Sequence, residues 1–247
     1  MYYRFVLDRV FILGVPVDKV SSAQVCDLIL QFTSGSQQKH IATPNSEMLV
    51  EASKNKAFKD LLNRTDLNIP DSAGLILASK FIKNPLIERV TGVDTVKKTC
   101  SKLDSKNSVF LLGAGSGVAE KAAENLKKDN PEIVIAGTYS GSPKPEDSEE
   151  IINRINECKP SILLVAYGAP AQEFWIDKYL NKMPSVRVAM GIGGTLDFIA
   201  GTVKRAPKIM RVLNLEWLFR LITQPWRFKR VWKAVVVFPF KVLTKSK

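Results

Sequence analysis

The chain has 247 residues, of which 45% are hydrophobic and 24% charged, as is ordinary for a folded soluble protein with a sizeable core. Its three cysteines (Cys26, Cys100 and Cys158) are odd in number and far apart, which argues against a disulfide framework or a zinc site and favours a reducing compartment. The net charge of +12 is unevenly distributed along the chain. Residues 201–247 hold twelve Lys or Arg against one acid, Glu216, a net +11, whereas residues 1–200 hold 24 basic and 23 acidic side chains, a net +1.

Apolar runs alternate with amphipathic helical patterns through the first 200 residues. In chain order we predict strand 10–14, helix 21–33, strand 40–43, helix 46–63, strand 66–70, helix 72–83, strand 108–112, helix 117–128, strand 133–137, helix 147–158, strand 161–166, helix 171–182 and strand 186–190. This alternation predicts an α/β fold: a Rossmann-like, mostly parallel sheet flanked by helices. We assign that domain to residues 1–200 and a C-terminal amphipathic helical appendage to residues 201–247.

Turns rich in small or polar residues follow six of these strands. They are TPNSE (43–47), DSAG (71–74), GAGSG (113–117), YSG (139–141), YGAP (167–170) and GIGGT (191–195). The carboxyl ends of parallel strands share one edge of a sheet, and ligands bind there. Any one such turn is explained by tight geometry alone, but six together predict one extended ligand site.

The turn 113–117 matches a dinucleotide-binding loop only in part. The fingerprint G-x-G-x-x-G needs a small residue where this chain has Val118, and the acidic residue expected to bind a ribose is replaced by the segment Thr138 to Ser140. Backbone N–H groups at the start of the next helix can still bind a phosphate. The turn therefore favours a nucleotide phosphate over NAD.

Metal chemistry finds little support in the sequence. His40 is the only histidine, and we interpret it as structural or solvated; no Asp-x-Asp pair is present. We expect no metal and no cofactor, so that arginines of the appendage are the candidates to neutralise bound phosphates.

Asp71 is the best candidate for a general base. It follows an apolar strand and is flanked by small residues that leave room for a substrate. A carboxylate there can remove a proton from an attacking hydroxyl. It can equally cap the helix predicted from residue 72, and position alone leaves both roles open.

The appendage combines basic and aromatic residues, including three of the four tryptophans (Trp217, Trp226 and Trp232). Helical spacing places an apolar stripe on one face and basic residues on another. The stripe is Phe228, Val231, Trp232, Val235 and Phe238, and the basic face is Arg227, Arg230 and Lys233. This pattern is typical of an interfacial membrane helix, and its apolar stripe argues against nucleic acid. No stretch approaches the roughly 18 apolar residues of a spanning helix.

Seven ordered blocks carry a resemblance to a known family. They are TPNSE (43–47), IPDSAG (69–74), ERVTGVD (88–94), FLLGAGSG (110–117), YGAPAQEFW (167–175), GIGGTLDFIAGTVKRAP (191–207) and LEWLFRLITQPWRFKR (215–230). Through them the chain resembles the WecG/TagA/CpsF glycosyltransferases over almost its whole length, most closely those that build the linkage unit of wall teichoic acid. Ser72 departs from the pattern, since the family usually has glycine after the aspartate.

The resemblance implies transfer of N-acetylmannosamine from its UDP donor to undecaprenyl-diphosphate N-acetylglucosamine, forming a β-1,4 bond with inversion and without a metal. The implied partners are the UDP-sugar donor, the polyprenyl-diphosphate-linked acceptor and an anionic membrane surface, with no nucleic acid. The implied location is peripheral, on the cytoplasmic face of the bacterial cell membrane. The sequence leaves the oligomeric state open, a homo-oligomer included.

The resemblance also implies roles for individual residues. Asp71 is the base, and Thr43, Asn45 and Arg89 complete the catalytic group. The donor-binding residues at the turns are Gly113, Gly115, Gly117, Tyr139, Gly168, Gln172, Glu173 and Asp197. Arg220, Arg227 and Arg230 match arginines that the family places over the active site, where they would bind the diphosphate at the membrane. The alternatives are a non-catalytic membrane-bound nucleotide-sugar-binding protein, which would not need Asp71, and an NAD-dependent oxidoreductase, which the broken fingerprint disfavours.

Overall fold

The computed structural model describes residues 7–245 and divides into two compact units. Unit 1 comprises Met1–Ser22, Pro44–Thr91 and Ala206–Lys247, and unit 2 comprises Ala23–Thr43 and Gly92–Arg205. Most of the appendage therefore packs with the segment 44–91. These compact units differ from the predicted domains 1–200 and 201–247, which were divided by charge. That the appendage has a separate function remains a prediction.

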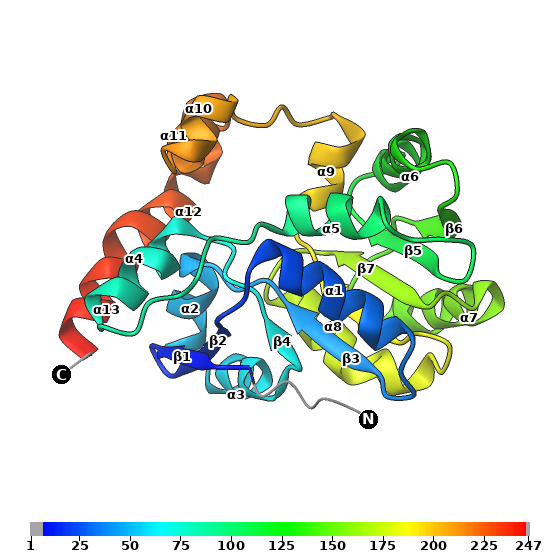
Figure 1. Cartoon of the computed structure of the whole chain (residues 1–247), viewed down its shortest axis with the longest axis horizontal. Coiled ribbons are helices and arrows are strands. Elements are labelled where there is room, and N and C mark those ends of the chain that lie inside the picture. The colour runs from blue at the N-terminus through cyan, green and yellow to red at the C-terminus, as the bar shows by residue number, and fades with distance from the viewer. Residues whose placement is uncertain (1–6, 246–247) are drawn as a thin grey trace. The chain divides into compact units, whose positions relative to one another are not determined.

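The centre of unit 2 is a set of parallel strands (Figure 1). In spatial order they are β3 (Lys39–Ala42), β8 (Val188–Gly191), β7 (Ile162–Ala166), β5 (Ser108–Gly113) and β6 (Val134–Tyr139). Their register places Ile41 beside Met190, and Leu164 beside both Met190 and Leu111. The parallel sheet with flanking helices confirms the predicted fold class.

Helices connect these strands as the alternating pattern predicts. They are α1 (Ser22–Thr33), α5 (Gly92–Cys100), α6 (Val118–Asp129), α7 (Ser148–Cys158), α8 (Ala171–Tyr179) and α9 (Thr195–Ala200), with 3-10 turns at Pro145–Asp147 and Leu180–Lys182. The predicted helix 171–182 is thus α8 with a 3-10 turn after it, and α5 and α9 were not predicted.

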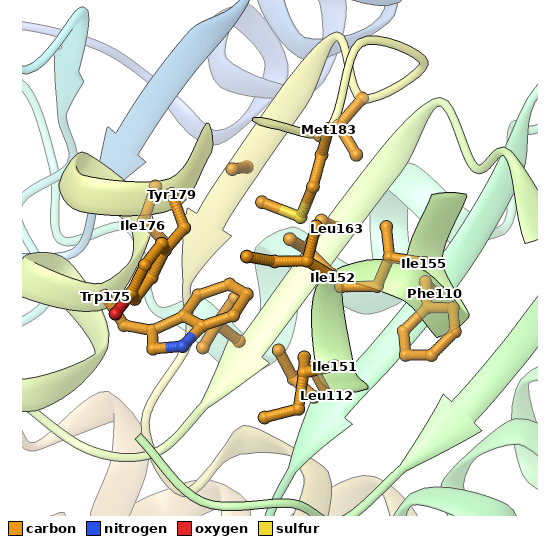
Figure 2. Close-up of a cluster of buried hydrophobic side chains, with 13 residues drawn as sticks. Phe110, Leu112, Ile151, Ile152, Ile155, Leu163, Trp175, Ile176, Tyr179 and Met183 are labelled. Atoms are coloured by element: carbon orange, nitrogen blue, oxygen red, sulfur yellow. The ribbon is translucent and has the colours of Figure 1, made fainter. Parts of the chain in front are cut away.

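The central strands β5, β7 and β8 are buried on both faces, which explains why they are apolar almost throughout instead of alternating. On one face Leu163 and Val165 pack against α7 and α8; Figure 2 shows the α8 side chains Trp175 and Ile176 among this cluster. On the other face Ile162 and Leu164 line a small gap together with residues of α1 and α5. The Trp175 indole N–H also donates to Ser148 Oγ at 3.2 Å, which fixes α8 to α7.

Unit 1 begins with an antiparallel hairpin, β1 (Arg9–Ile12) and β2 (Val15–Asp18). Leu13 and Gly14 both have positive φ, as a two-residue hairpin turn requires; the predicted strand 10–14 ran through this turn. The fully buried Asp18 carboxylate accepts from Arg9 Nε at 2.7 Å and from the Asn68 N–H at 2.7 Å, which ties the hairpin to β4 (Leu67–Asn68). Burial raises the pKa of Asp18, and these two partners oppose that rise.

The helices of unit 1 come from two distant parts of the chain. The first group is α2 (Ser46–Ala52), α3 (Lys56–Arg64) and α4 (Ala73–Phe81). The predicted single helix 46–63 is wrong: Asn55 adopts extended backbone and its side chain accepts from the Phe58 N–H, so that a second helix starts there. The preceding helix α2 is capped in the same way, because Asn45 occupies its N-cap position and accepts from the Met48 N–H.

The appendage supplies the second group of helices. It forms α10 (Lys208–Val212), α11 (Glu216–Thr223), a 3-10 turn (Pro225–Arg227), α12 (Phe228–Trp232), a π-helical turn (Lys233–Val237) and α13 (Phe238–Lys245). The predicted stripe is divided: Phe228 and Trp232 are exposed, whereas Phe238 is 1% exposed and Val242 is also buried. The π-turn widens the helix and shifts the face that follows it, which a spacing of 3.6 residues per turn does not anticipate.

Candidate functional site

In unit 2 the carboxyl ends of five parallel strands share one edge, and five of the six predicted turns follow those ends. All eight predicted donor-binding residues and Thr43 lie in these turns, at a strand end or in the first turn of the following helix. The topology therefore confirms a shared edge for five turns, whereas the sixth, 71–74, follows β4 in unit 1. Their contact with a donor remains a prediction.

The β5–α6 turn has the geometry of an anion-binding loop. Gly113 and Gly117 have φ of +98° and +74°, and a Cβ on Gly113 would lie 2.9 Å from the Ala166 backbone carbon, so that only glycine fits. Gly117 occupies the N-cap position of α6 and has no side chain to cap the first turn; Gly115 and Ser116 are exposed beside it. The positive dipole end of this twelve-residue helix thus lies beside an exposed turn, although the Val118 N–H already donates to the Gly115 carbonyl.

The turns after β7 and β8 are organised differently, because one glutamine occupies their N–H groups. Gln172 Oε1 accepts from the Gly168 N–H at 3.0 Å and from the Gly193 N–H at 2.9 Å. Gln172 is 1% exposed and its Nε2 donates to Glu173 Oε1 at 2.9 Å. The Gly168 N–H therefore already has a hydrogen-bond partner inside the protein. If Gly168 contributes to the donor site as predicted, it would do so through the shape of its turn and not through this N–H.

Of the two interpretations of His40, structural or solvated, its burial supports the structural one. His40 is 7% exposed, and its Nε2 lies 2.8 Å from Oε2 of Glu173, which is 0% exposed. Glu173 cannot touch a ligand from that position and reaches the edge only through Gln172. Sequence reasoning missed His40 as a member of this group because its partner lies 133 residues away.

Three further predicted residues border the same edge. Thr43 Oγ1 donates to the Gly191 carbonyl at 2.9 Å, which ties the end of β3 to the end of β8. Tyr139 lies under the Arg154 guanidinium, 4.6 Å from the ring centroid, and its hydroxyl donates to Glu150. Asp197 is half-buried in the first turn of α9.

Tyr167 is an edge residue that was not among the predicted site residues. Within residues 7–245 its buried hydroxyl has no hydrogen-bond partner, and burial raises its pKa well above the ordinary value for tyrosine. It therefore stays a neutral hydroxyl that water or a ligand would satisfy.

Asp71 lies in unit 1, at a junction of three segments. Its N–H donates to the Pro44 carbonyl at 3.0 Å, and the Val90 N–H donates to the Pro70 carbonyl at 2.9 Å. These bonds place Asn45, Asp71 and Arg89 in adjoining segments. A catalytic group of these residues with Thr43 remains a prediction. The N-cap position of α4 belongs to Ser72 and not to Asp71, which removes the simplest form of the capping role.

Ser72, the departure from the family pattern, is accommodated locally. Its Oγ lies 3.1 Å from both the N–H and the Oγ of Ser46. A Cβ at Gly74 would collide with the same Ser46 hydroxyl, so glycine is needed for this close approach. The Asn45 side chain is engaged as the α2 cap, which gives this predicted catalytic residue a structural role as well.

Two arginines of the candidate site form ion pairs that link the appendage to the rest of unit 1. Arg89 lies 3.7 Å from the carboxylate of Glu216 in α11, with both side chains less than one-fifth exposed. Arg230 Nε binds both carboxylate oxygens of Glu47, at 3.0 and 2.8 Å. Glu47 and Glu216 were missed, although both stand in motif blocks of the sequence. Arg220 and Arg227 lie in the same appendage and are half-buried.

Large apolar side chains are exposed along the appendage. They are Ile209, Val212, Leu213, Trp217, Ile222, Trp226, Phe228, Trp232, Val235, Val236, Phe240 and Leu243. Leu77 and Phe81 of α4 are exposed in the same unit. Exposed apolar surface of this extent marks an interaction surface. Within residues 7–245 no helix combines the length and apolarity needed to cross a membrane.

The chain is similar to known proteins over most of its length. The family described as "Glycosyl transferase WecG/TagA/CpsF family" matches residues 10–247. The chain is 36% identical over 216 residues to a Bacillus spizizenii protein named N-acetylglucosaminyldiphosphoundecaprenol N-acetyl-beta-D-mannosaminyltransferase, covering 87% of this chain and 83% of that protein. A Staphylococcus aureus protein of the same name is 35% identical over 238 residues, covering 95% of this chain and 92% of its own length.

Proposed function

Because the chain belongs to the WecG/TagA/CpsF family of glycosyltransferases, we propose that it transfers N-acetylmannosamine from UDP-N-acetylmannosamine to undecaprenyl-diphosphate-linked N-acetylglucosamine, in synthesis of the wall teichoic acid linkage unit. The observation that carries the proposal is the family match over residues 10–247, together with relatives named for this transfer at 35–36% identity. The motif blocks that carry the resemblance coincide with the Asp71 junction and the strand-edge turns.

Unit 2 would bind the nucleotide of the donor. The exposed glycine turn before α6, which has no side-chain cap, supports a diphosphate site there, because backbone N–H groups and the helix dipole favour an anion. The turns pinned by Gln172 would give the edge its fixed shape, with Tyr139, Asp197 and Thr43 along it. The donor sugar is the finer part of the proposal and rests on the names of the relatives.

Asp71 would be the base, and four arginines would supply the cations. In a direct displacement the acceptor hydroxyl oxygen forms a bond to the anomeric carbon while Asp71 takes its proton. The bond between that carbon and the UDP oxygen breaks, and its electron pair leaves with UDP. Arg89, Arg220, Arg227 and Arg230 would stabilise the negative charge that develops on the diphosphate.

The appendage would also hold the protein on the cytoplasmic face of the membrane. Each Lys or Arg near an anionic leaflet contributes about 1 kcal/mol, and each apolar side chain that enters the interface roughly 1.5–3 kcal/mol. The net +11 of residues 201–247 and the exposed tryptophans Trp226 and Trp232 support this role.

A transfer assay tests the proposal. We expect label from UDP-N-acetylmannosamine to appear in a lipid-diphosphate N-acetylglucosamine analogue, and the rate to persist in excess EDTA because the sequence has no Asp-x-Asp pair and one histidine. Calorimetry with UDP on the same protein separates the alternatives: UDP binding without turnover would indicate a non-catalytic nucleotide-sugar-binding protein. Activity lost in EDTA and restored by Mg²⁺ would contradict the metal-free mechanism.

A further inference from the structure

The buried pair His40–Glu173 has no role in the mechanism above, yet it lies directly behind the ligand edge of unit 2. We propose that His40 and Glu173 are positioning residues for the nucleotide-sugar site, which hold Gln172 in the one orientation that pins the turns after β7 and β8. The inference rests on the proposed function for its ligand, a UDP-sugar, and on hydrogen bonds alone for its mechanism.

The orientation of the Gln172 amide is fixed from both ends. The Gly168 and Gly193 N–H groups can only donate, so the side-chain atom that meets both must be the oxygen. The nitrogen then faces Glu173, whose carboxylate can only accept. A reversed amide would place N–H against N–H and oxygen against carboxylate, and would lose all three bonds.

Glu173 is in turn fixed by His40. Glu173 Oε1 accepts from Gln172, while Oε2 lies 2.8 Å from His40 Nε2 and accepts from it in the tautomer that is protonated on Nε2. The carboxylate also packs against the backbone of β8, because a Cβ on Gly191 would collide with Oε1. Without the His40 donor, a fully buried carboxylate would have an unsatisfied oxygen, and water or a rotamer change would be needed to satisfy it.

Loss of the His40–Glu173 pair should mainly affect the ligand edge. Gln172 joins two turns that border the donor site, and the Gly191 carbonyl of the same strand end receives the Thr43 hydroxyl. Loosening the pair should therefore weaken binding of the nucleotide more than it lowers the thermal stability of the fold. A residue with only a structural role would lower stability and leave the affinity of the folded fraction unchanged.

A matched control exists in the same unit. Gln38 Nε2 donates to the carbonyls of Leu180, Met183 and Val186 at 2.9–3.0 Å, so it also pins a turn through a glutamine amide. It precedes β3 and thus lies at the amino-terminal end of the strands, away from the ligand edge. Gln38→Ala should lower stability without changing the affinity for UDP.

The first experiment uses three substitutions of His40 in the full-length protein, with UDP binding measured by calorimetry and donor KM and kcat measured by transfer. His40→Ala removes the donor, His40→Leu removes it while filling the space, and His40→Gln supplies a new donor. We expect His40→Ala and His40→Leu to raise the Kd for UDP and the donor KM on the order of 10-fold, as removal of an orienting partner does. His40→Gln should restore most of the affinity, and the acceptor KM should not change.

The second experiment measures amide exchange of Gly168 and Gly193 by NMR, and it does not depend on activity. In wild-type protein both amides should exchange more slowly than those of Gly115 and Gly117, and both should accelerate together in His40→Leu. Wild-type amides that exchange as fast as Gly115, or a folded His40→Leu or His40→Ala protein with unchanged UDP affinity, would overturn the proposal. A wild-type protein that binds no UDP would instead refute the proposed function. The exchange rates of Gly168 and Gly193 would still test whether His40 and Glu173 hold Gln172 against these two amides.

Discussion

Asp71→Asn is expected to lower kcat for transfer by about 100-fold or more while UDP binding and folding stay near normal. Asparagine has the shape of aspartate but cannot accept the proton of the attacking hydroxyl. The N-cap position of α4 belongs to Ser72, and the Asp71 backbone N–H, which the substitution retains, makes the bond to Pro44. The measurement is kcat with UDP-N-acetylmannosamine and a water-soluble acceptor, alongside the melting temperature.

Asp60→Asn is the matched control for this change. Asp60 lies on α3 of the same unit and pairs with Lys56 at an exposed position, so the same chemical substitution there should leave kcat unchanged. If Asp71→Asn turned over within a few-fold of wild type, Asp71 would not be the base.

The second large effect is expected from the appendage arginines. Arg220→Ala, Arg227→Ala and Arg230→Ala should each slow transfer to a water-soluble acceptor roughly 10- to 100-fold, because a charge-assisted bond to phosphate contributes about 1.5–3 kcal/mol. Binding to vesicles that contain anionic phospholipid should change little for each single substitution. The converse change, Trp226→Ser, removes an indole that is 76% exposed and should weaken vesicle binding while sparing the soluble reaction.

Arg230 requires its own control because it already binds Glu47. If Arg230 serves only that ion pair, Glu47→Gln should reproduce the loss seen in Arg230→Ala. If Arg230 binds the diphosphate, Glu47→Gln should leave the rate unchanged or raise it. Equal losses of transfer rate in the two variants would show that Arg230 does not bind the diphosphate.

Point substitutions test the appendage better than truncation does. From charge alone, a body cut near residue 200 is predicted to keep its fold. However, Ala206, Phe238 and Val242 are buried in unit 1, and a Cβ on Gly74 would lie 3.5 Å from the Phe238 ring. Deletion would uncover this core, so loss of activity in a truncated protein would mix lost arginines with lost stability.

The strands of unit 2 could be predicted because their apolar runs are buried on both faces, as Leu163 and Leu164 illustrate. Elements whose formation depends on tertiary contacts could not be predicted from the sequence. β2 includes Pro16, which argues against a strand. Pro16 is nevertheless buried and pairs with Phe11 in a two-stranded hairpin, where each strand is an edge strand and tolerates proline. The break before α3 was signalled by Asn55, a good N-cap residue, and could have been read.

The candidate site was predictable where its residues stand in turns after strands, as for Asp71 and the 113–117 turn. It was not predictable where side chains pair across long distances in the sequence. His40 with Glu173, and Arg230 with Glu47, are separated by 133 and 183 residues. Local spacing carries no information about such pairs, and only the fold brings them together.

The stereochemistry of the transfer product tests the central claim, a direct displacement with one general base, most directly. The product made from UDP-N-acetylmannosamine and the lipid-diphosphate analogue should be isolated, and the one-bond carbon–proton coupling of its new anomeric centre measured by NMR. Direct displacement should give a single product with a β linkage to O4 of N-acetylglucosamine, inverted relative to the α-configured donor. A product of retained α configuration would require two successive displacements through a second nucleophile, and would contradict the account.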